Sequence, residues 1–145
     1  MKGKYYESEY EEAFCDLLRE QGWSIEHGDN LRRKFPDALI GEDLLAFLKM
    51  QYGAYGLTDS DYNTIVAKLR NVGGATDYLS HREAYKLYHD GFDMNFSDAN
   101  KPSVHIDYID YTKSGYKRNI FRAINQFEMH EGKENRRPDI MLFIN

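Results

Sequence analysis

The chain has 145 residues, of which 41% are hydrophobic and 30% charged, enough to bury the core of one soluble domain over residues 1–145. Its formal net charge of −5 excludes a protein that wraps nucleic acid through a generally basic surface, although basic residues can still gather locally. No apolar run approaches the roughly 20 residues of a membrane helix, so no membrane partner is expected.

The N-terminus and the cysteine count indicate the compartment. Residues 1–6 lead directly into charged residues and lack the apolar segment of a secretory signal. Cys15 is the single cysteine, so an internal disulfide is impossible. Both observations favour a cytoplasmic protein, and Cys15 is expected to pack inside a helix rather than to carry chemistry.

The first element is predicted to be a helix that begins at Ser8 and ends at Gly22. Ser8 is a good N-cap, and Glu11 completes a capping box three residues later. Apolar residues then recur at helical spacing, at Tyr10, Phe14, Leu17 and Leu18. Several acidic residues crowd the first turns, where the helix dipole favours negative charge: Glu7, Glu9, Glu11 and Glu12.

A short strand and three more helices follow. Residues 23–27 alternate as a strand does, residues 28–30 form a turn, and Pro36 indicates a loop over residues 32–38. The apolar residues from Leu44 to Leu48 predict a second helix that ends near Gly53.

The third and fourth helices complete the middle of the chain. Thr58, with Asp61 as its capping-box partner, predicts the start of the third helix, and the two glycines at 73–74 end it. The fourth helix is predicted over residues 77–90. Asp59 to Asn63 imitate a calcium loop, but the loop glycine and the final glutamate are absent, so this segment is interpreted as a helix cap.

The last third of the chain is predicted to be strands. Residues 92–96, 104–111 and 119–130 alternate between apolar and polar, and residues 132–135 turn the chain into a buried strand over residues 140–144. The fold class is therefore an α+β or α/β sandwich, with consecutive strands that look antiparallel and a sheet whose last-placed strand is the C-terminal one. No cysteine pair, histidine pair, glycine-rich loop or nucleophile elbow indicates another kind of site.

A candidate site lies at the start of the final strand. A charged, basic turn carries Arg136 and Arg137, Pro138 follows, and Asp139 stands where the apolar strand begins. A carboxylate fixed at a strand end is well placed to hold a metal ion. Proline and aspartate are also common in turns for conformational reasons alone, so Pro138 and Asp139 are equally consistent with a non-catalytic interpretation.

The same residues resemble a known family. Pro-Asp before an apolar strand resembles the first half of the PD…(D/E)xK nuclease motif. The wider pattern resembles the N-terminal nuclease domain of the restriction (R) subunit of type I restriction-modification enzymes. The likeness spans the chain and rests on residues 7–11, 21–23, 125–127 and 136–145.

The resemblance implies a restriction-endonuclease-like core with a mixed sheet and inserted helices. It implies that this domain cuts DNA with Mg²⁺ after an ATP-driven motor in the full protein has translocated the DNA. It implies that Asp139 is the first metal ligand and that Glu11 is an accessory catalytic ligand, although Glu11 is equally explained as a capping-box acid. Lys133, Arg136 and Arg137 are candidates for DNA phosphate contact, or else a solvated turn. The implied partners are DNA and the methylase and specificity subunits.

One departure from the family pattern limits the activity expected. The family continues past the position of Asn145 with a further strand bearing Glu-x-Lys, so we expect a fragment that lacks its last core strands and is inactive alone. The strand edge near Ile140 to Ile144 would then be open to self-association. The alternative function is a non-catalytic α+β docking module, which salt-dependent DNA binding would distinguish from the nuclease.

Overall fold

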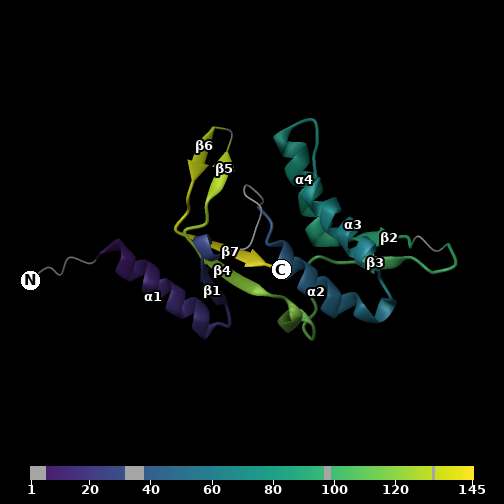
Figure 1. Ribbon diagram of the computed structural model, residues 1–145, viewed down its shortest axis with the longest axis horizontal. Helices are drawn as coiled ribbons and strands as arrows, with labels where there is room; N and C mark the ends of the chain where they lie inside the picture. The colour runs from purple at the N-terminus through teal and green to yellow at the C-terminus, as the bar shows by residue number, and fades with distance from the viewer. Residues whose placement is uncertain (1–5, 32–37, 97–98, 132) are drawn as a thin grey trace, which may run out of the picture. The chain divides into compact units, whose positions relative to one another are not determined.

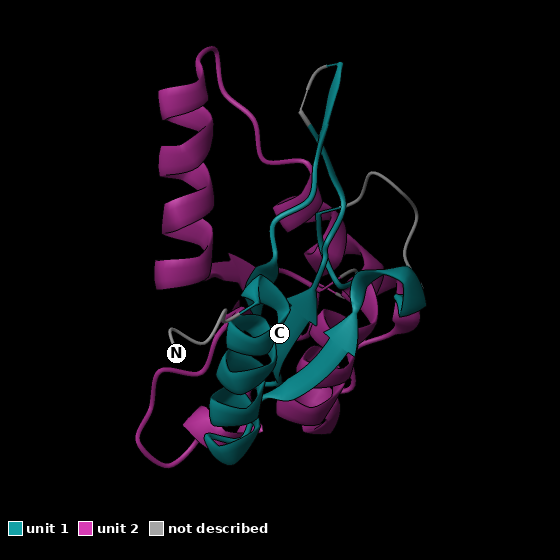
Figure 2. Cartoon of the chain, turned by 90° about the vertical axis from the view of Figure 1, so that its left-hand side faces the viewer, with its two compact units in different colours: residues 1–40, 120–144 teal, residues 41–119, 145 magenta. Residues whose placement is uncertain are grey.

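The computed structural model describes residues 6–31, 38–96, 99–131 and 133–145 (Figure 1). Most of the predicted loop over residues 32–38 lies outside these ranges. The chain divides into two compact units, one of residues 1–40 and 120–144 and the other of residues 41–119 and 145 (Figure 2). One domain over residues 1–145 therefore stays a prediction. Among the described residues, none of the helices combines the length and apolar character needed to cross a bilayer.

The first unit is built on a mixed three-stranded sheet, which confirms the predicted α+β class. The strand order is β1 (Ser24–His27), β4 (Phe121–Asn125), β7 (Ile140–Ile144). β4 runs parallel to β1 and antiparallel to β7, with His27 and Ile140 both opposite Asn125. Helix α1 (Glu7–Glu20) contacts β1, and most of the residues between β1 and β4 in the chain, 41–119, belong to the second unit.

Helix α1 begins earlier than predicted, so the assignment of Ser8 as N-cap is wrong. Tyr6 is the N-cap, and its backbone N–H donates to Glu9 Oε2 at 3.1 Å, so Glu9 and not Glu11 is the acidic partner at this end. The predicted end at Gly22 is confirmed. Gly22 has φ +91°, and Trp23 N–H donates to Leu18 O at 3.0 Å, which closes the helix with the backbone reversal that glycine favours.

The predicted strand over residues 119–130 is two strands. β4 ends at Asn125 because Gln126 adopts a left-handed φ of +57°. The chain resumes as β5 (Met129–Glu131), which pairs antiparallel with β6 (Glu134–Arg136). The predicted basic turn is therefore wrong in part, because Arg136 lies in a strand. The β5–β6 hairpin projects away from the three-stranded sheet (Figure 1).

β7 has the predicted bounds but is only partly buried. Met141 and Phe143 pack against a core of Ile40, Ile124 and Phe127, with the rings of Phe127 and Phe143 5.0 Å apart. On the other face of β7, Leu142 is 49% exposed and Ile144 is 41% exposed. Among the described residues β7 pairs with β4 alone, which places it at the edge of its sheet, as expected. Self-association through this edge stays a prediction.

The second unit contains the three predicted helices and a short hairpin. The helices are α2 (Gly41–Tyr52), α3 (Asp59–Arg70) and α4 (Asp77–Asp90), and the hairpin joins β2 (Phe92–Met94) to β3 (Val104–Ile106). The predicted cap of α3 is confirmed, since Thr58 Oγ1 accepts from Asp61 N–H at 3.2 Å and Asp61 Oδ2 accepts from Thr58 N–H at 2.8 Å.

The predicted strand over residues 104–111 ends at Ile106. Beyond it, backbone amides donate to side chains instead of to a neighbouring strand. Asp107 N–H donates to Tyr52 Oη at 2.7 Å, and Asp110 N–H donates to Asn119 Oδ1 at 2.9 Å. The alternating pattern continues past the point where the ladder stops, because Tyr108 is buried in the core of this unit.

His105 of β3 has acceptors at both ring nitrogens. Its Nδ1 lies 2.7 Å from Asp93 Oδ1, directly across the hairpin, and its Nε2 lies 3.0 Å from the Asp90 carbonyl oxygen and 3.3 Å from Asp107 Oδ1. Both nitrogens can donate only when the ring is protonated. The hydrogen bond to Asp93 is the main cause that raises the pKa of His105 above its ordinary value.

We expect His105→Gln to destabilise the protein most at low pH. A raised pKa in the folded state gives stability that is complete below the unfolded pKa of about 6.5 and is lost as the pH rises through the folded pKa. Urea unfolding of both proteins between about pH 5 and 9 checks this. His81→Gln, at an exposed position on α4, is the control, and a difference for His105→Gln that grows with pH would contradict the expectation.

Candidate metal centre

Three carboxylates come together in the first unit. Glu7 and Glu11 come from α1, and Asp139 stands immediately before β7. One carboxylate oxygen of each lies within 4.8 Å of the others. Glu7 and Glu11 are four residues apart, so they share one face of the helix. Within the described residues, this is the one group of three metal-ligating side chains that lie this close.

Only part of the apolar side of α1 is buried beside the sheet, while Tyr10, Phe14 and Leu17 are exposed. Cys15 and Leu18 are 4% and 6% exposed, and the helix packs on β1. Burial raises the pKa of the Cys15 thiol, which keeps it protonated, as expected for a packing residue. The face that carries Glu7 and Glu11 is thereby held at the end of the sheet from which Asp139 projects.

Asp139 is held by the bend that follows β4. The backbone N–H of Gln126 donates to the Asp139 carbonyl oxygen at 2.8 Å. The side-chain amide of Gln126 donates to Asp139 Oδ1 at 3.4 Å. These contacts extend the β4–β7 pairing by one residue past the opposition of Asn125 and Ile140. Asp139 is therefore anchored by its backbone while its carboxylate remains exposed.

A pocket of about 390 Å³ adjoins the carboxylates. It lies between α1 and the ends of β1 and β4, and Glu11 belongs both to its lining and to the carboxylate group. Its other lining residues are mainly polar and include Ser8, Glu12, Arg19, Glu26, His27 and Asn125. Space for water or for part of a polar ligand is thus available beside Glu11.

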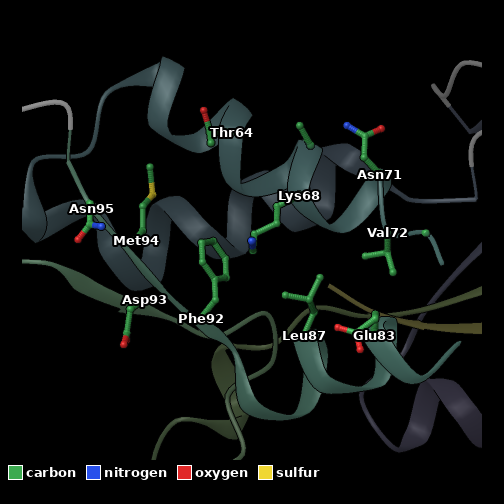
Figure 3. Close-up of a pocket in the computed structure, with 12 residues that line it drawn as sticks. Thr64, Lys68, Asn71, Val72, Glu83, Leu87, Phe92, Asp93, Met94 and Asn95 are labelled. Atoms are coloured by element: carbon green, nitrogen blue, oxygen red, sulfur yellow. The ribbon is translucent and has the colours of Figure 1, made fainter. Parts of the chain in front are cut away.

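The second unit has a larger pocket of a different character. It has a volume of about 750 Å³ and lies between α3, α4 and β2 (Figure 3). Lys68 points over the ring of Phe92, with its Nζ 4.8 Å from the ring centroid. Its lining mixes the apolar side chains of Val72, Leu87 and Met94 with polar ones that include Asn71, Glu83 and Asp93. Among the described residues, the one group of three potential metal ligands lies in the first unit and not here.

The donor set in the first unit fits a hard divalent cation. Mg²⁺ is bound by oxygen atoms, commonly by one or a few carboxylates with water completing the coordination shell. Glu7, Glu11 and Asp139 supply such oxygens, and the exposure of Glu7 and Asp139 leaves room for water. The same three charges repel one another when no cation lies between them.

Comparison with known proteins identifies the family of the chain. A family model described as the type I restriction enzyme R protein N terminus matches residues 4–145. The chain belongs to this family. No curated protein matches the chain.

For this member of the R protein family, the structure brings together two of the predicted residues, Asp139 and Glu11. Sequence reasoning missed Glu7, which was explained by the helix dipole alone. Its spacing of four residues from Glu11 was a usable signal, because it places both carboxylates on one helix face. The catalytic and metal-binding roles of Asp139 and Glu11 stay predictions.

The predicted phosphate contacts lie outside the carboxylate group. Lys133 is exposed in the β5–β6 hairpin, and Arg136 lies in β6 with its guanidinium 4.0 Å from the Glu134 carboxylate. Arg137 follows β6, and its guanidinium is 3.8 Å from Asp29 Oδ2. Their role in DNA binding stays a prediction.

We expect a divalent cation to stabilise the wild-type chain against unfolding. At a Mg²⁺ or Mn²⁺ concentration of about ten times Kd the gain is about 1.4 kcal/mol. Asp139→Asn should lose most of that gain, and without added cation it should melt no lower than the wild type, because one repelling charge is removed. Thermal melts with and without cation check this.

The matched control is Glu20→Gln, at the opposite end of α1 from the carboxylate group. It should keep the cation-dependent gain. An equal gain in the wild type and in Asp139→Asn would show that the cation acts elsewhere.

Proposed function

We propose that this chain is the metal-dependent DNA endonuclease part of a type I restriction enzyme R protein, and that Glu7, Glu11 and Asp139 hold Mg²⁺. The observation that carries the proposal is the meeting of these three carboxylates from the two ends of the described chain. The match to the R protein N terminus over residues 4–145 supports it independently.

The chemistry assigned to each group follows from its position. Mg²⁺, when bound, activates a water and stabilises charge on a phosphate oxygen during phosphodiester hydrolysis. Asp139 and Glu7, which are exposed, and Glu11, which also lines the polar pocket, would hold the ion through their carboxylate oxygens. In the full R protein this step is coupled to an ATP-driven DNA translocase, with methylase and specificity subunits as partners.

The β5–β6 hairpin is proposed to contact DNA phosphates through Lys133, Arg136 and Arg137. It projects from the sheet, and all three side chains are exposed. The hairpin leads directly into Asp139 and β7, so phosphates bound there would lie along the same segment as the metal ligand. The ion pairs with Glu134 and Asp29 are weak at exposed positions and can exchange for phosphate.

The 145 residues alone are expected not to cleave DNA. The motif that the sequence resembles also uses a Glu-x-Lys, and residues 140–145 contain neither glutamate nor lysine. Incubation of supercoiled plasmid with the chain and Mg²⁺ should leave it intact. Nicking that requires Mg²⁺ and disappears in Asp139→Ala would overturn this expectation.

The chain is expected to bind duplex DNA weakly and to release it as salt rises. The slope of log affinity against log salt is about −0.9 for each phosphate contact. The combined variant Lys133→Ala, Arg136→Ala, Arg137→Ala should therefore bind less tightly and flatten that slope. Fluorescence anisotropy over a salt series measures both quantities.

The control variant removes two exposed basic residues of α4 in the second unit, Arg82→Ala with Lys86→Ala. It should keep the wild-type slope. Absence of DNA binding at low salt would instead favour the non-catalytic docking module, and equal loss in both variants would show that the hairpin is not the site.

A further inference from the structure

The bend at Gln126 is conformationally costly. Gln126 and Asn145 are the two non-glycine residues with positive φ in the described part of the chain, at +57° and +64°. Asparagine adopts this region several times more often than most residues do, whereas glutamine has no such preference. Glycine would adopt it freely. The conformation of Gln126 is therefore imposed by its surroundings.

Three neighbours hold this bend in place. The Gln126 N–H donates to the Asp139 carbonyl oxygen at 2.8 Å. Gly28 lies so close that a Cβ there would stand 2.3 Å from the Gln126 carbonyl oxygen. Phe127 is fully buried, and its ring lies 5.0 Å from that of Phe143. The backbone of Gln126 is thus fixed from β1, from β7 and from the core.

The fixed backbone directs the side chain to one carboxylate. Gln126 Nε2 donates to Asp139 Oδ1 at 3.4 Å. An amide donor on one carboxylate oxygen limits rotation of the group, and one oxygen of this carboxylate lies within 4.8 Å of oxygens of Glu7 and Glu11. A glycine at position 126 would satisfy the backbone with less strain, but it could not make this contact.

We propose that Gln126 is a positioning residue that orients the Asp139 carboxylate toward Glu7 and Glu11 for binding a divalent cation. This inference rests on the proposed metal site. Gln126 acts through Asp139 and does not itself ligate the ion. The side-chain NH₂ group that contacts Asp139 is a hydrogen-bond donor and cannot bind a cation. The three proposed ligands, Glu7, Glu11 and Asp139, do not include the side-chain oxygen of Gln126.

The test separates metal affinity from stability. Gln126→Gly removes the amide and relieves the backbone, so its unfolding temperature without metal should equal or exceed that of the wild type. Its Mn²⁺ affinity should fall by about 10-fold, the lower end of the usual loss when a partner of a metal ligand is removed. Isothermal titration of the full chain with Mn²⁺ gives the affinity, and calorimetric melting gives the stability.

A second variant keeps the test independent of the added flexibility of glycine. Gln126→Asn tolerates the left-handed backbone but is one methylene shorter, so its amide no longer reaches Asp139. It should lose affinity to a similar extent. Gln51→Ala is the matched control, because Gln51 donates an equivalent amide hydrogen bond to Asp110 Oδ2 at 3.2 Å in the second unit. It should keep wild-type affinity.

The outcomes distinguish this inference from the proposed function. Mn²⁺ affinity that is unchanged in Gln126→Gly and Gln126→Asn, but lost in Asp139→Asn, would overturn the role of Gln126 and leave the metal site intact. No Mn²⁺ binding by the wild type would overturn both, because Asp139 would then have no ion to be oriented toward.

Discussion

The candidate site depends on the double pairing of strand β4. Its parallel partner β1 and its antiparallel partner β7 place the end of one strand and the start of another at the same end of the sheet. Asp139 enters at that end directly, as the residue before β7. Glu7 and Glu11 enter indirectly, because α1 packs on β1. β4 is therefore the strand that holds the segment with Asp139 close to the segment on which α1 packs.

Local signals in the sequence identify much of this arrangement. Thr58 with Asp61, and Gly22 after α1, mark helix ends correctly because the hydrogen bonds involved span only a few residues. The apolar run from Ile140 to Ile144 identifies β7 by its composition, although the hydrogen-bond partner of this strand, β4, lies elsewhere in the chain. The family likeness, which begins from Pro138 and Asp139, agrees with the match to the R protein N terminus.

The features that sequence reasoning missed depend on distant partners. The Gln126 bend interrupts a continuous alternation, and its cause lies in Gly28 and Asp139, far along the chain in both directions. β3 stops early because the next backbone N–H, that of Asp107, donates to the hydroxyl of Tyr52 in α2 instead of to a strand. Glu7 becomes a candidate metal ligand, and not only an acid favoured by the helix dipole, once the fold places Asp139 beside it. Periodicity contains none of this information.

The pairing of residue 24 with residue 122 also has a kinetic consequence. β4 and β7 are close in sequence and can pair early. The pairing of β1 with β4 must instead close a loop that contains residues 41–119 of the second unit. Non-local pairings of this kind are the slow steps of folding. If β4 and β7 pair first, Asp139 is in place before Glu7 and Glu11 arrive, and the repulsion among the three acids arises only in the final stage. We expect a cation that binds the proposed site to accelerate that last step of refolding rather than the first collapse.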